Sequence, residues 1–293
     1  MASPSAVIES NTPQAEGEWI QQSRGFYACP ACKQDLEPVH DGLSCRVCAR
    51  TYPIVNGIPD FLVGNLEESR NRSLHVVGNW DSRPLFNFMA SAYESCVYPA
   101  VCNLWGGWHS TSLKHLAHDV SDIVGSRDGV ILDAACGPGT YGRRIASASR
   151  TVLGVDICMS MMRRGAHYVE REHIPNVHFA RATVEAMPFR DGQFDAAICA
   201  GSLNHFSDVL LVLREINRTM KPGAPLAVMC FARINSGLIK YKSVRDRVEK
   251  GGGHIYSVAD LERLVAEAGL AGFSSHTYGS IIVFSTHKMP AEH

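Results

Sequence analysis

The sequence contains no apolar run approaching the roughly 20 residues that a helix needs to cross a bilayer. Its opening stretch, MASPSAVIESNTPQAEGEW, lacks the basic and apolar regions of a secretory signal. An excess of either charge is also absent, because 28 basic and 29 acidic residues give a formal net charge of −1. Proteins that bind nucleic-acid phosphates usually carry a basic excess, so a nucleic-acid substrate is disfavoured. We expect a cytoplasmic protein without a membrane span, in which residues 1–24 are a disordered leader rich in Ser, Pro, Ala and Glu.

Ten cysteines in a chain without an export signal indicate a reducing compartment and metal binding or free thiols rather than disulfides. Four of them form two pairs, Cys29-x2-Cys32 and Cys45-x2-Cys48, separated by twelve residues. Two such turns can aim four thiolates at one centre, which is the tetrahedral set that structural zinc prefers. The alternatives are two disulfides or four unconnected thiols. Four protein ligands leave no open coordination position, so this metal is expected to stabilise the fold and to take no part in catalysis.

The stretch that follows the second cysteine pair reads YPIVNGIPDFL, a strand and a turn at Asn56-Gly57. Together the two pairs and this tail resemble the Trm112-like zinc ribbon that precedes some methyltransferases. The resemblance covers residues 25–63, which we predict to form a small zinc ribbon. About forty residues are too few for a stable core, and the metal supplies what burial does not.

Residues 64–118 are predicted to form a linker followed by a helical cap. The first part, 64–82, is polar, whereas aromatic and apolar residues crowd the stretch from 84 to 118. Several fall at helical spacing, and Pro99 and Gly106-Gly107 interrupt them. These short helices either cover an active site or simply pack on the main domain.

From residue 129 onward, apolar strand-like runs alternate with amphipathic helices. This alternation predicts an α/β fold, a doubly wound and mostly parallel sheet with helices on both faces. We place this domain at residues 119–293. Its helix 207–220 is expected to begin at Ser207 or Asp208, and the helix after Ser257 to be capped by that residue.

The turn GPGTYG after the strand GVILDA matches G-x-G-x-x-G, and Asp156 ends the next strand nineteen residues after Gly137. This pattern also fits a dinucleotide site. Asp133, four residues before Gly137, separates the two interpretations. A carboxylate at that position would repel a pyrophosphate but would favour the α-amino group of an amino-acid ligand.

The stretches VILDAACGPGT, ATVEAMPFRDGQFDAAICAGSLNHF and LREINRTMKPGAPLAV resemble class I S-adenosylmethionine (SAM)-dependent methyltransferases of the methyltransferase domain 11/25 type. The resemblance covers about residues 128–290 and implies a Rossmann-like seven-stranded sheet. It implies that Asp156 binds the ribose hydroxyls and that Asp133 engages the amino group. Many relatives carry Asp where this chain has Thr183, which weakens the expected adenine contact. The expected SAM-binding residues are Asp133, Ala135, Gly137, Gly139, Asp156, Ile157, Thr183, Val184, Ala200 and Tyr98.

Methyl transfer needs an aligned nucleophile and, for some acceptors, a base. His205 lies where many relatives of this family contact substrate, so it is either a base or a residue that shapes the site. Tyr93 resembles aromatic residues of the cap, and His254 and Tyr256 precede the last helix on the expected substrate side. Plain packing is an equally good interpretation of the tyrosines.

Three functions follow from these patterns. The first is methylation of a small, fairly apolar metabolite, such as a phenol, quinone, terpenoid or polyketide, in secondary metabolism. The second is an rRNA guanine methyltransferase, against which the weakly basic ribbon argues. The third is a non-catalytic SAM-binding scaffold. The expected cofactors are SAM and a structural Zn²⁺. The sequence leaves open a homodimer and does not determine whether O, N or C accepts the methyl group.

Overall fold

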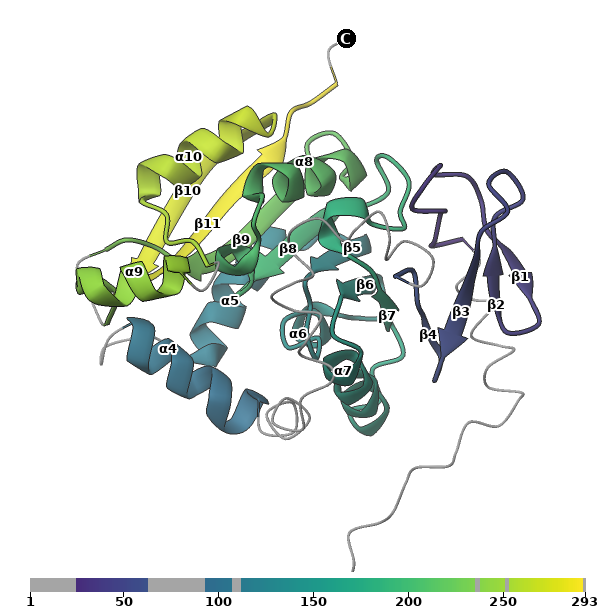
Figure 1. The fold of residues 1–293 in the computed structure, drawn as a ribbon, viewed down its shortest axis with the longest axis horizontal. Coiled ribbons are helices and arrows are strands. Elements are labelled where there is room, and N and C mark those ends of the chain that lie inside the picture. Colours follow the sequence, from purple (N-terminus) through teal and green to yellow (C-terminus); the bar gives the residue numbers. More distant parts are fainter. Residues whose placement is uncertain (1–24, 63–92, 107–111, 235–237, 251–252, 292–293) are drawn as a thin grey trace, which may run out of the picture.

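A computed structural model of the chain describes residues 25–62, 93–106, 112–234, 238–250 and 253–291. Two sheets organise these residues, a small one of four strands near the amino terminus and a large one of seven (Figure 1). The expected linker 64–82 and leader 1–24 lie outside the described residues. In the described part of the chain, every helix is too short or too polar to cross a membrane.

The large sheet has the order β10-β11-β9-β8-β5-β6-β7. The five strands from β9 to β7 pair in parallel, whereas β11 is antiparallel to both of its neighbours. Its strands are β5 (Gly129–Ala134), β6 (Arg150–Asp156), β7 (Val177–Arg181), β8 (Ala196–Ala200), β9 (Pro225–Phe231), β10 (Leu270–Tyr278) and β11 (Ile281–Lys288). The expected seven-stranded, mostly parallel α/β fold is therefore confirmed.

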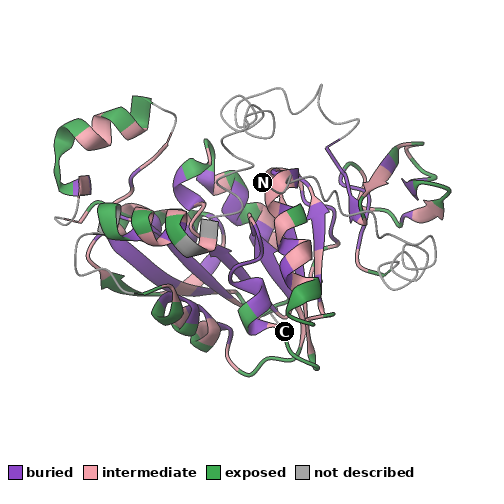
Figure 2. Cartoon of the chain, turned by 90° about the horizontal axis from the view of Figure 1, so that it is seen from below, coloured by how far each residue is buried: buried purple, intermediate pink, exposed green. Residues whose placement is uncertain are grey.

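Successive strand residues face two separate cores, as the alternation of side chains along a strand requires. Ile131 and Val152 pack with the helices of one face, and the next residues, Leu132 and Leu153, pack with those of the other. The first face carries α5 (Leu113–Val124), α6 (Gly142–Ile145) and α7 (Met159–Arg171). The second carries α8 (Val209–Thr219) and α10 (Val258–Glu267). Figure 2 shows the buried strands between these helix layers.

Helix caps explain where several of these helices begin. Asp208 accepts a hydrogen bond from the backbone N–H of Leu211 and caps α8, and Ser257 forms a capping box with Asp260 at the start of α10. α5 crosses position 118, where the cap was expected to end, and packs on β8, β9 and β11. α6 is only four residues long, because Ala146 is already extended and Ser147 bridges to Arg150.

The cap elements that the structure describes are the π-helical turn η1 (Tyr93–Val97) and α4 (Tyr98–Gly106). α4 ends at Gly106, as expected, but Pro99 lies in its first turn, where proline is tolerated. A further helix that the sequence did not predict, α9 (Lys242–Lys250), follows the 3₁₀ turn η4 (Leu238–Lys240), which contacts α4. Figure 1 shows α4 and α9 at the same end of the molecule.

The small sheet has the order β1-β2-β3-β4, with strands β1 (Glu37–Val39), β2 (Gly42–Ser44), β3 (Thr51–Val55) and β4 (Ile58–Pro59). It lies beside β7, at one edge of the large sheet (Figure 1). Asp60 forms a parallel bridge with Arg181 of β7, and the N–H of Phe61 donates to the carbonyl of Arg181 at 2.8 Å. The small sheet therefore covers an edge that would otherwise expose unpaired backbone groups.

Candidate functional site

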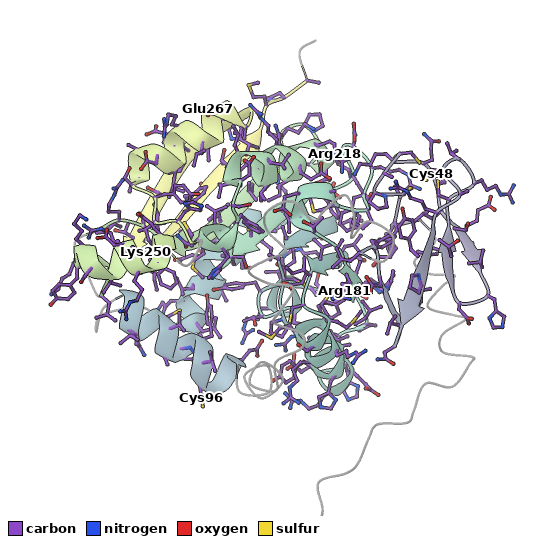
Figure 3. All side chains as sticks on the ribbon, in the orientation of Figure 1. Cys48, Cys96, Arg181, Arg218, Lys250 and Glu267 are labelled. Atoms are coloured by element: carbon purple, nitrogen blue, oxygen red, sulfur yellow. The ribbon has the colours of Figure 1, made fainter. Side chains whose placement is uncertain are left out.

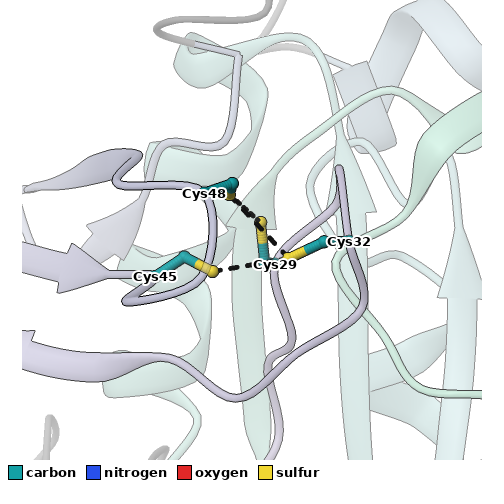
Figure 4. Close-up of side chains that lie close together, drawn as sticks. All are labelled: Cys29, Cys32, Cys45 and Cys48. Atoms are coloured by element: carbon teal, nitrogen blue, oxygen red, sulfur yellow. Dashed lines mark hydrogen bonds between the residues drawn. The ribbon is translucent and has the colours of Figure 1, made fainter.

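The four paired cysteines converge on one point (Figure 4). Their Sγ atoms all lie within 4.8 Å of one another, with three of the separations between 3.4 and 3.8 Å. A disulfide would bring two sulfurs to about 2.05 Å, so that alternative does not apply. Zn–S bonds of about 2.3 Å in a tetrahedron place sulfurs roughly 3.8 Å apart. The donor set therefore fits zinc, in a closed site that leaves no position for substrate.

Each cysteine pair sits on a turn of the same shape. The residue after the second cysteine of each pair, Lys33 and Ala49, has a left-handed φ of 59° and 53°. The hydroxyl of Tyr52 lies 3.3 Å from the Sγ of Cys29, where it can donate to a thiolate. The sequence analysis did not identify Tyr52 as part of the site, because its partner lies 23 residues away.

The glycine turn follows β5 and sits at the point where the strand order reverses, between β5 and β8. Ligands of open α/β sheets bind at this switch point, outside the carboxyl ends of the strands. Ala135, Gly137 and Gly139 all have positive φ, of 55°, 54° and 70°. A Cβ on Gly137 would meet open space, whereas one on Gly139 would lie 3.0 Å from the ring of Phe179. Gly137 therefore leaves the turn open toward a ligand, and Gly139 packs the turn against the sheet.

Asp156 ends β6 beside this turn and is held by two backbone donors. Its Oδ2 accepts from the N–H of Gly137 and its Oδ1 from the N–H of Cys158, both at 2.8 Å. The residue is half-buried. A carboxylate can accept about four hydrogen bonds. The geometry therefore fits a carboxylate that also accepts hydrogen bonds from the two hydroxyls of a ribose.

Asp133 lies beneath the turn rather than on its surface, with only 3% of the residue exposed. Its Oδ2 accepts from the N–H of Gly142 at 3.1 Å. Burial raises the pKa of this carboxyl to about 7, and the nearby charge of Asp156 adds to the effect. A cationic group close to the turn would stabilise the ionised form.

The expected adenine contacts lie on the loops after β6 and β7. Ile157 is half-buried, and its carbonyl accepts from Nε of Arg181 at 2.9 Å. Thr183 precedes the 3₁₀ turn η2 (Val184–Ala186), in which Val184 is buried. The Thr183 hydroxyl is hydrogen-bonded to the carboxylate of Glu185. That bond engages the hydroxyl that was expected to reach the adenine.

The loop after β8 brings together His205 and His254, two of the residues expected on the acceptor side, and follows Ala200, which was expected to bind the cofactor. Ala200 ends β8, and His205 ends the 3₁₀ turn η3 (Leu203–His205). Asn204 is buried, and its amide donates to the carbonyls of Phe231 and His254, at 2.8 and 2.6 Å. The N–H of His254 donates back to the Asn204 carbonyl at 2.8 Å. Asn204 thus fixes His254 beside the His205 turn, a role that no sequence pattern indicated.

His205 retains an exposed side chain, yet the protein atoms around its ring lower its pKa by desolvation. This shift favours the neutral imidazole, the form that a base requires. The ring of Tyr256 lies 5.9 Å from that of His254, centroid to centroid. Burial raises the pKa of Tyr256 to about 12, so its hydroxyl stays protonated at neutral pH. The structure places Tyr93 in η1 but does not describe its side chain.

Tyr98 brings the cap to the glycine turn and to the end of β8. Its hydroxyl lies 2.6 Å from that of Tyr141, which follows the turn. A Cβ on Gly201 would lie 3.5 Å from the ring of Tyr98. The predicted cap therefore contacts the region where the cofactor is expected.

A buried arginine, which the sequence analysis did not single out, also joins the cap to the turn. Only 3% of the Arg143 side chain is exposed, and its guanidinium pairs with Glu94 of η1 and Glu172 at the end of α7. Its Nε donates to the carbonyl of Pro138, within the turn, at 3.3 Å. Glu94 also accepts from the hydroxyl of Thr140 at 2.7 Å. One side chain thus holds the cap, the turn and α7 in a fixed relation.

Residues 131–223 match the family described as "Methyltransferase domain", and residues 26–57 match the family "Trm112p-like protein". A 2-phytyl-1,4-naphtoquinone methyltransferase of a Nostoc species is 32% identical over 36% of this chain and 48% of its own length. The demethylmenaquinone methyltransferase of Lactococcus lactis is 27% identical over 59% of this chain and 66% of its own length. The chain thus spans about half to two thirds of these relatives.

Among solved structures, phosphoethanolamine N-methyltransferase 2 of Haemonchus contortus, bound to S-adenosyl-L-methionine, is similar in fold, with a TM-score of 0.59. It is 16% identical, and the match covers 73% of this chain and 60% of that protein. At this identity the similarity establishes the fold, whereas the activity must be argued from the site. The expected resemblances, to a class I methyltransferase domain and to a Trm112-like ribbon, are both confirmed.

Proposed function

This chain carries a methyltransferase domain behind a Trm112p-like segment, and on that premise we propose that it transfers a methyl group from SAM to a small, fairly apolar metabolite. The supporting observation is the arrangement at the switch point of the sheet. An open glycine, a carboxylate held by two N–H groups and a neutral histidine lie at the carboxyl ends of β5, β6 and β8. The named activities of the two bacterial relatives, both on naphthoquinone-type acceptors, support the substrate class.

SAM supplies an electrophilic methyl group on a sulfonium ion, so the protein mainly has to bind and orient. In this proposal Asp156 accepts the ribose hydroxyls and the turn at Gly137 lies against the methionine part. Asp133 balances the amino group from beneath the turn. His205 lies on the loop after β8 and takes a proton from the acceptor hydroxyl as the nucleophile forms. A phenol-like acceptor makes this step easier than an aliphatic alcohol would, because a phenolic hydroxyl, with a pKa near 10, gives up its proton more readily.

Substitution of His205 by alanine is expected to reduce turnover on a quinol or phenol by roughly 100-fold, the usual contribution of a general base. The dissociation constant for SAM should change by less than about threefold, because His205 lies on the acceptor side. Turnover is measured with methyl-labelled SAM, and the affinity for SAM is measured by calorimetry. Unchanged turnover would exclude His205 as the base.

The acceptor class is best tested by incubating the purified chain with methyl-labelled SAM and three acceptor sets. These are naphthoquinols and benzoquinols, simple phenols, and ribosomal RNA. Label in the quinols or phenols supports the proposal. Label in RNA alone would replace it with the rRNA guanine methyltransferase. Calorimetric binding of SAM without label in any acceptor would favour the non-catalytic scaffold.

One segment favours the RNA alternative. Residues 240–250 are basic, because they contain five cations and only two carboxylates. The ribbon does not add to it, since Arg46 pairs with Glu37 and Asp35 pairs with Arg190. RNA binding is therefore an outcome that the acceptor screen has to test.

A further inference from the structure

Two exposed apolar side chains and four exposed cations lie on α4 and on residues 240–250, which run from the end of η4 through α9, near the loop that carries His205. We refer to them as the acceptor rim, which comprises Leu104, Lys240, Tyr241, Lys242, Arg247 and Lys250. α4 contacts η4, and η4 contacts α9. Figure 3 places Lys250 at the opposite end of the molecule from Cys48 and the zinc ribbon. The acceptor rim is therefore a surface separate from the ribbon.

The positive charge of this surface is local. Residues 240–250 contain five cations and two carboxylates, a net charge of +3, in a chain whose formal net charge is −1. None of the α9 residues is buried. Lys242 pairs with Asp246, on which Lys250 acts only at longer range, while Lys240, Arg247 and Lys250 have no carboxylate oxygen within 4.0 Å in the part of the chain that the structure describes. An anionic surface would find these charges accessible.

Exposed apolar groups accompany the charge. Leu104 is 57% exposed and Tyr241 51% exposed, and they are two of the six large apolar residues that lie exposed among the described residues. The Lys240 ammonium lies 4.9 Å from the centroid of the Tyr241 ring. An aromatic ring combined with lysines is typical of surfaces that bind at the boundary between lipid headgroups and acyl chains.

The acceptor rim is fixed close to the acceptor side of the site. Nη1 of Arg245 donates to the carbonyls of Ile239 and Lys240, at 2.7 and 2.8 Å, and this ties η4 to α9. At the other end of α9, the N–H of Gly253 donates to the carbonyl of Val248 at 3.0 Å. The next residue, His254, is held by Asn204, the neighbour of His205. A molecule that arrives at the acceptor rim is thus near the loop that carries His205.

We propose that the acceptor rim docks this protein on an anionic lipid surface, from which the apolar acceptor enters the site. The cations would bind headgroups, and Tyr241 and Leu104 would enter the boundary region. Lipid is favoured over RNA because RNA phosphates give no reason for an exposed leucine beside the cations. The source of the acceptor rests on the proposed function, whereas the docking itself can be measured without any acceptor.

Docking is tested by flotation of the full chain with phosphatidylcholine vesicles that contain or lack phosphatidylglycerol. The wild-type chain should bind the anionic vesicles, and binding should weaken as salt screens the charges. The triple variant Lys240→Gln, Arg247→Gln, Lys250→Gln should bind on the order of 100-fold more weakly, since each cation near an anionic surface contributes about a factor of five. A second variant, Tyr241→Ser with Leu104→Ser, should lose affinity with its charge unchanged.

The matched control removes three other exposed cations, by Arg127→Gln, Arg171→Gln and Arg214→Gln, and should bind vesicles as the wild type does. A wild-type chain that ignores anionic vesicles, or a control that loses as much as the rim variant, would overturn the proposal. So would binding to transfer RNA that depends on the acceptor rim without binding to vesicles. Vesicle binding without methylation of any quinol or phenol would leave docking intact and refute the proposed function. Methylation without vesicle binding would support the proposed function and refute the docking.

Discussion

At the scale of single residues, the two aspartates of the glycine turn have different environments. Asp156 is half-buried and held by two N–H donors, whereas Asp133 is buried with its pKa raised to about 7. The sequence analysis placed both at strand ends and assigned both to the cofactor. Only the packing shows that Asp156 is half-buried at the turn and that Asp133 lies buried beneath it.

If Asp133 balances the amino group of SAM as proposed, we expect cofactor affinity to depend on pH. The cationic amino group of SAM favours the ionised carboxylate, so binding below pH 7 has to release the Asp133 proton. Affinity should therefore rise by up to tenfold per pH unit toward pH 7 and then level off. The slope should vanish in Asp133→Asn, as measured by calorimetry.

The control for this experiment is Asp122→Asn, an exposed carboxylate on α5, which should keep the slope of the wild type. If Asp133 only supports the turn, its Asn variant will bind SAM as tightly as the wild type at every pH. The stability of the free protein gives a second readout. A buried carboxyl with a raised pKa favours the fold below its unfolded pKa of about 4, and this advantage is lost as pH rises to about 7. The stability of the Asp133→Asn variant should not show this decrease between about pH 4 and 7.

His205 predicts the pH dependence of turnover. Desolvation lowers its pKa, so the base stays neutral to a lower pH than an ordinary histidine does. Turnover at saturating substrates should stay constant from pH 8 to about 6.5. At lower pH it should decrease with the pH dependence of a single protonation. His173→Gln, an exposed histidine after α7, should leave this profile unchanged. A fall that begins above pH 7 would assign the base to another group.

At the scale of elements, the contact between the cap and the glycine turn depends on Arg143. This buried guanidinium joins Glu94 of η1 to the carbonyl of Pro138 and to Glu172. The π-helical turn that carries Glu94 is a rare element that often occurs at functional sites. We therefore expect the cap to hold the cofactor in place through this pair.

Glu94→Gln keeps the shape of the side chain and removes its charge. The SAM dissociation constant should rise about tenfold, equivalent to about 1.4 kcal/mol, while turnover at saturating SAM stays within about twofold. Calorimetry and a cofactor-chase measurement check both values. Glu170→Gln, an exposed residue of α7, serves as the control. An unchanged dissociation constant would mean that the cap closes without the Glu94–Arg143 pair.

At the scale of the whole molecule, the cysteine-rich ribbon and the large α/β domain share one core. The ring centroids of Tyr27 and Phe189 lie 5.8 Å apart, and those of Phe189 and Phe194 lie 4.8 Å apart. Lys33 donates to the carbonyl of Met187 at 2.9 Å, and Gln193 to that of Phe26 at 2.8 Å. The ribbon also covers the β7 edge, so its metal is expected to stabilise the whole chain.

Cys45→Ser should therefore lower the melting temperature of the entire protein. A loss of at least about 2 kcal/mol corresponds to roughly 4–8 °C for a domain of this size. Cys96→Ser, an exposed cysteine outside the metal cluster, should leave the melting temperature unchanged (Figure 3). Calorimetry and zinc content by mass spectrometry provide the readouts. A Cys45→Ser protein with full zinc content and unaltered melting would refute the zinc assignment.

The sequence by itself determined the doubly wound sheet, the metal cluster and the position of the glycine turn. These features depend on short-range patterns, namely alternating apolar runs, paired cysteines and glycines at fixed spacing, which act within a few residues of one another. Only the tertiary structure decided the burial of Asp133, the clamp of Asn204 on His254, the Arg143 contacts and the exposed helix α9. Each of these depends on distant segments meeting, because burial and ion pairing arise from what surrounds a residue in space.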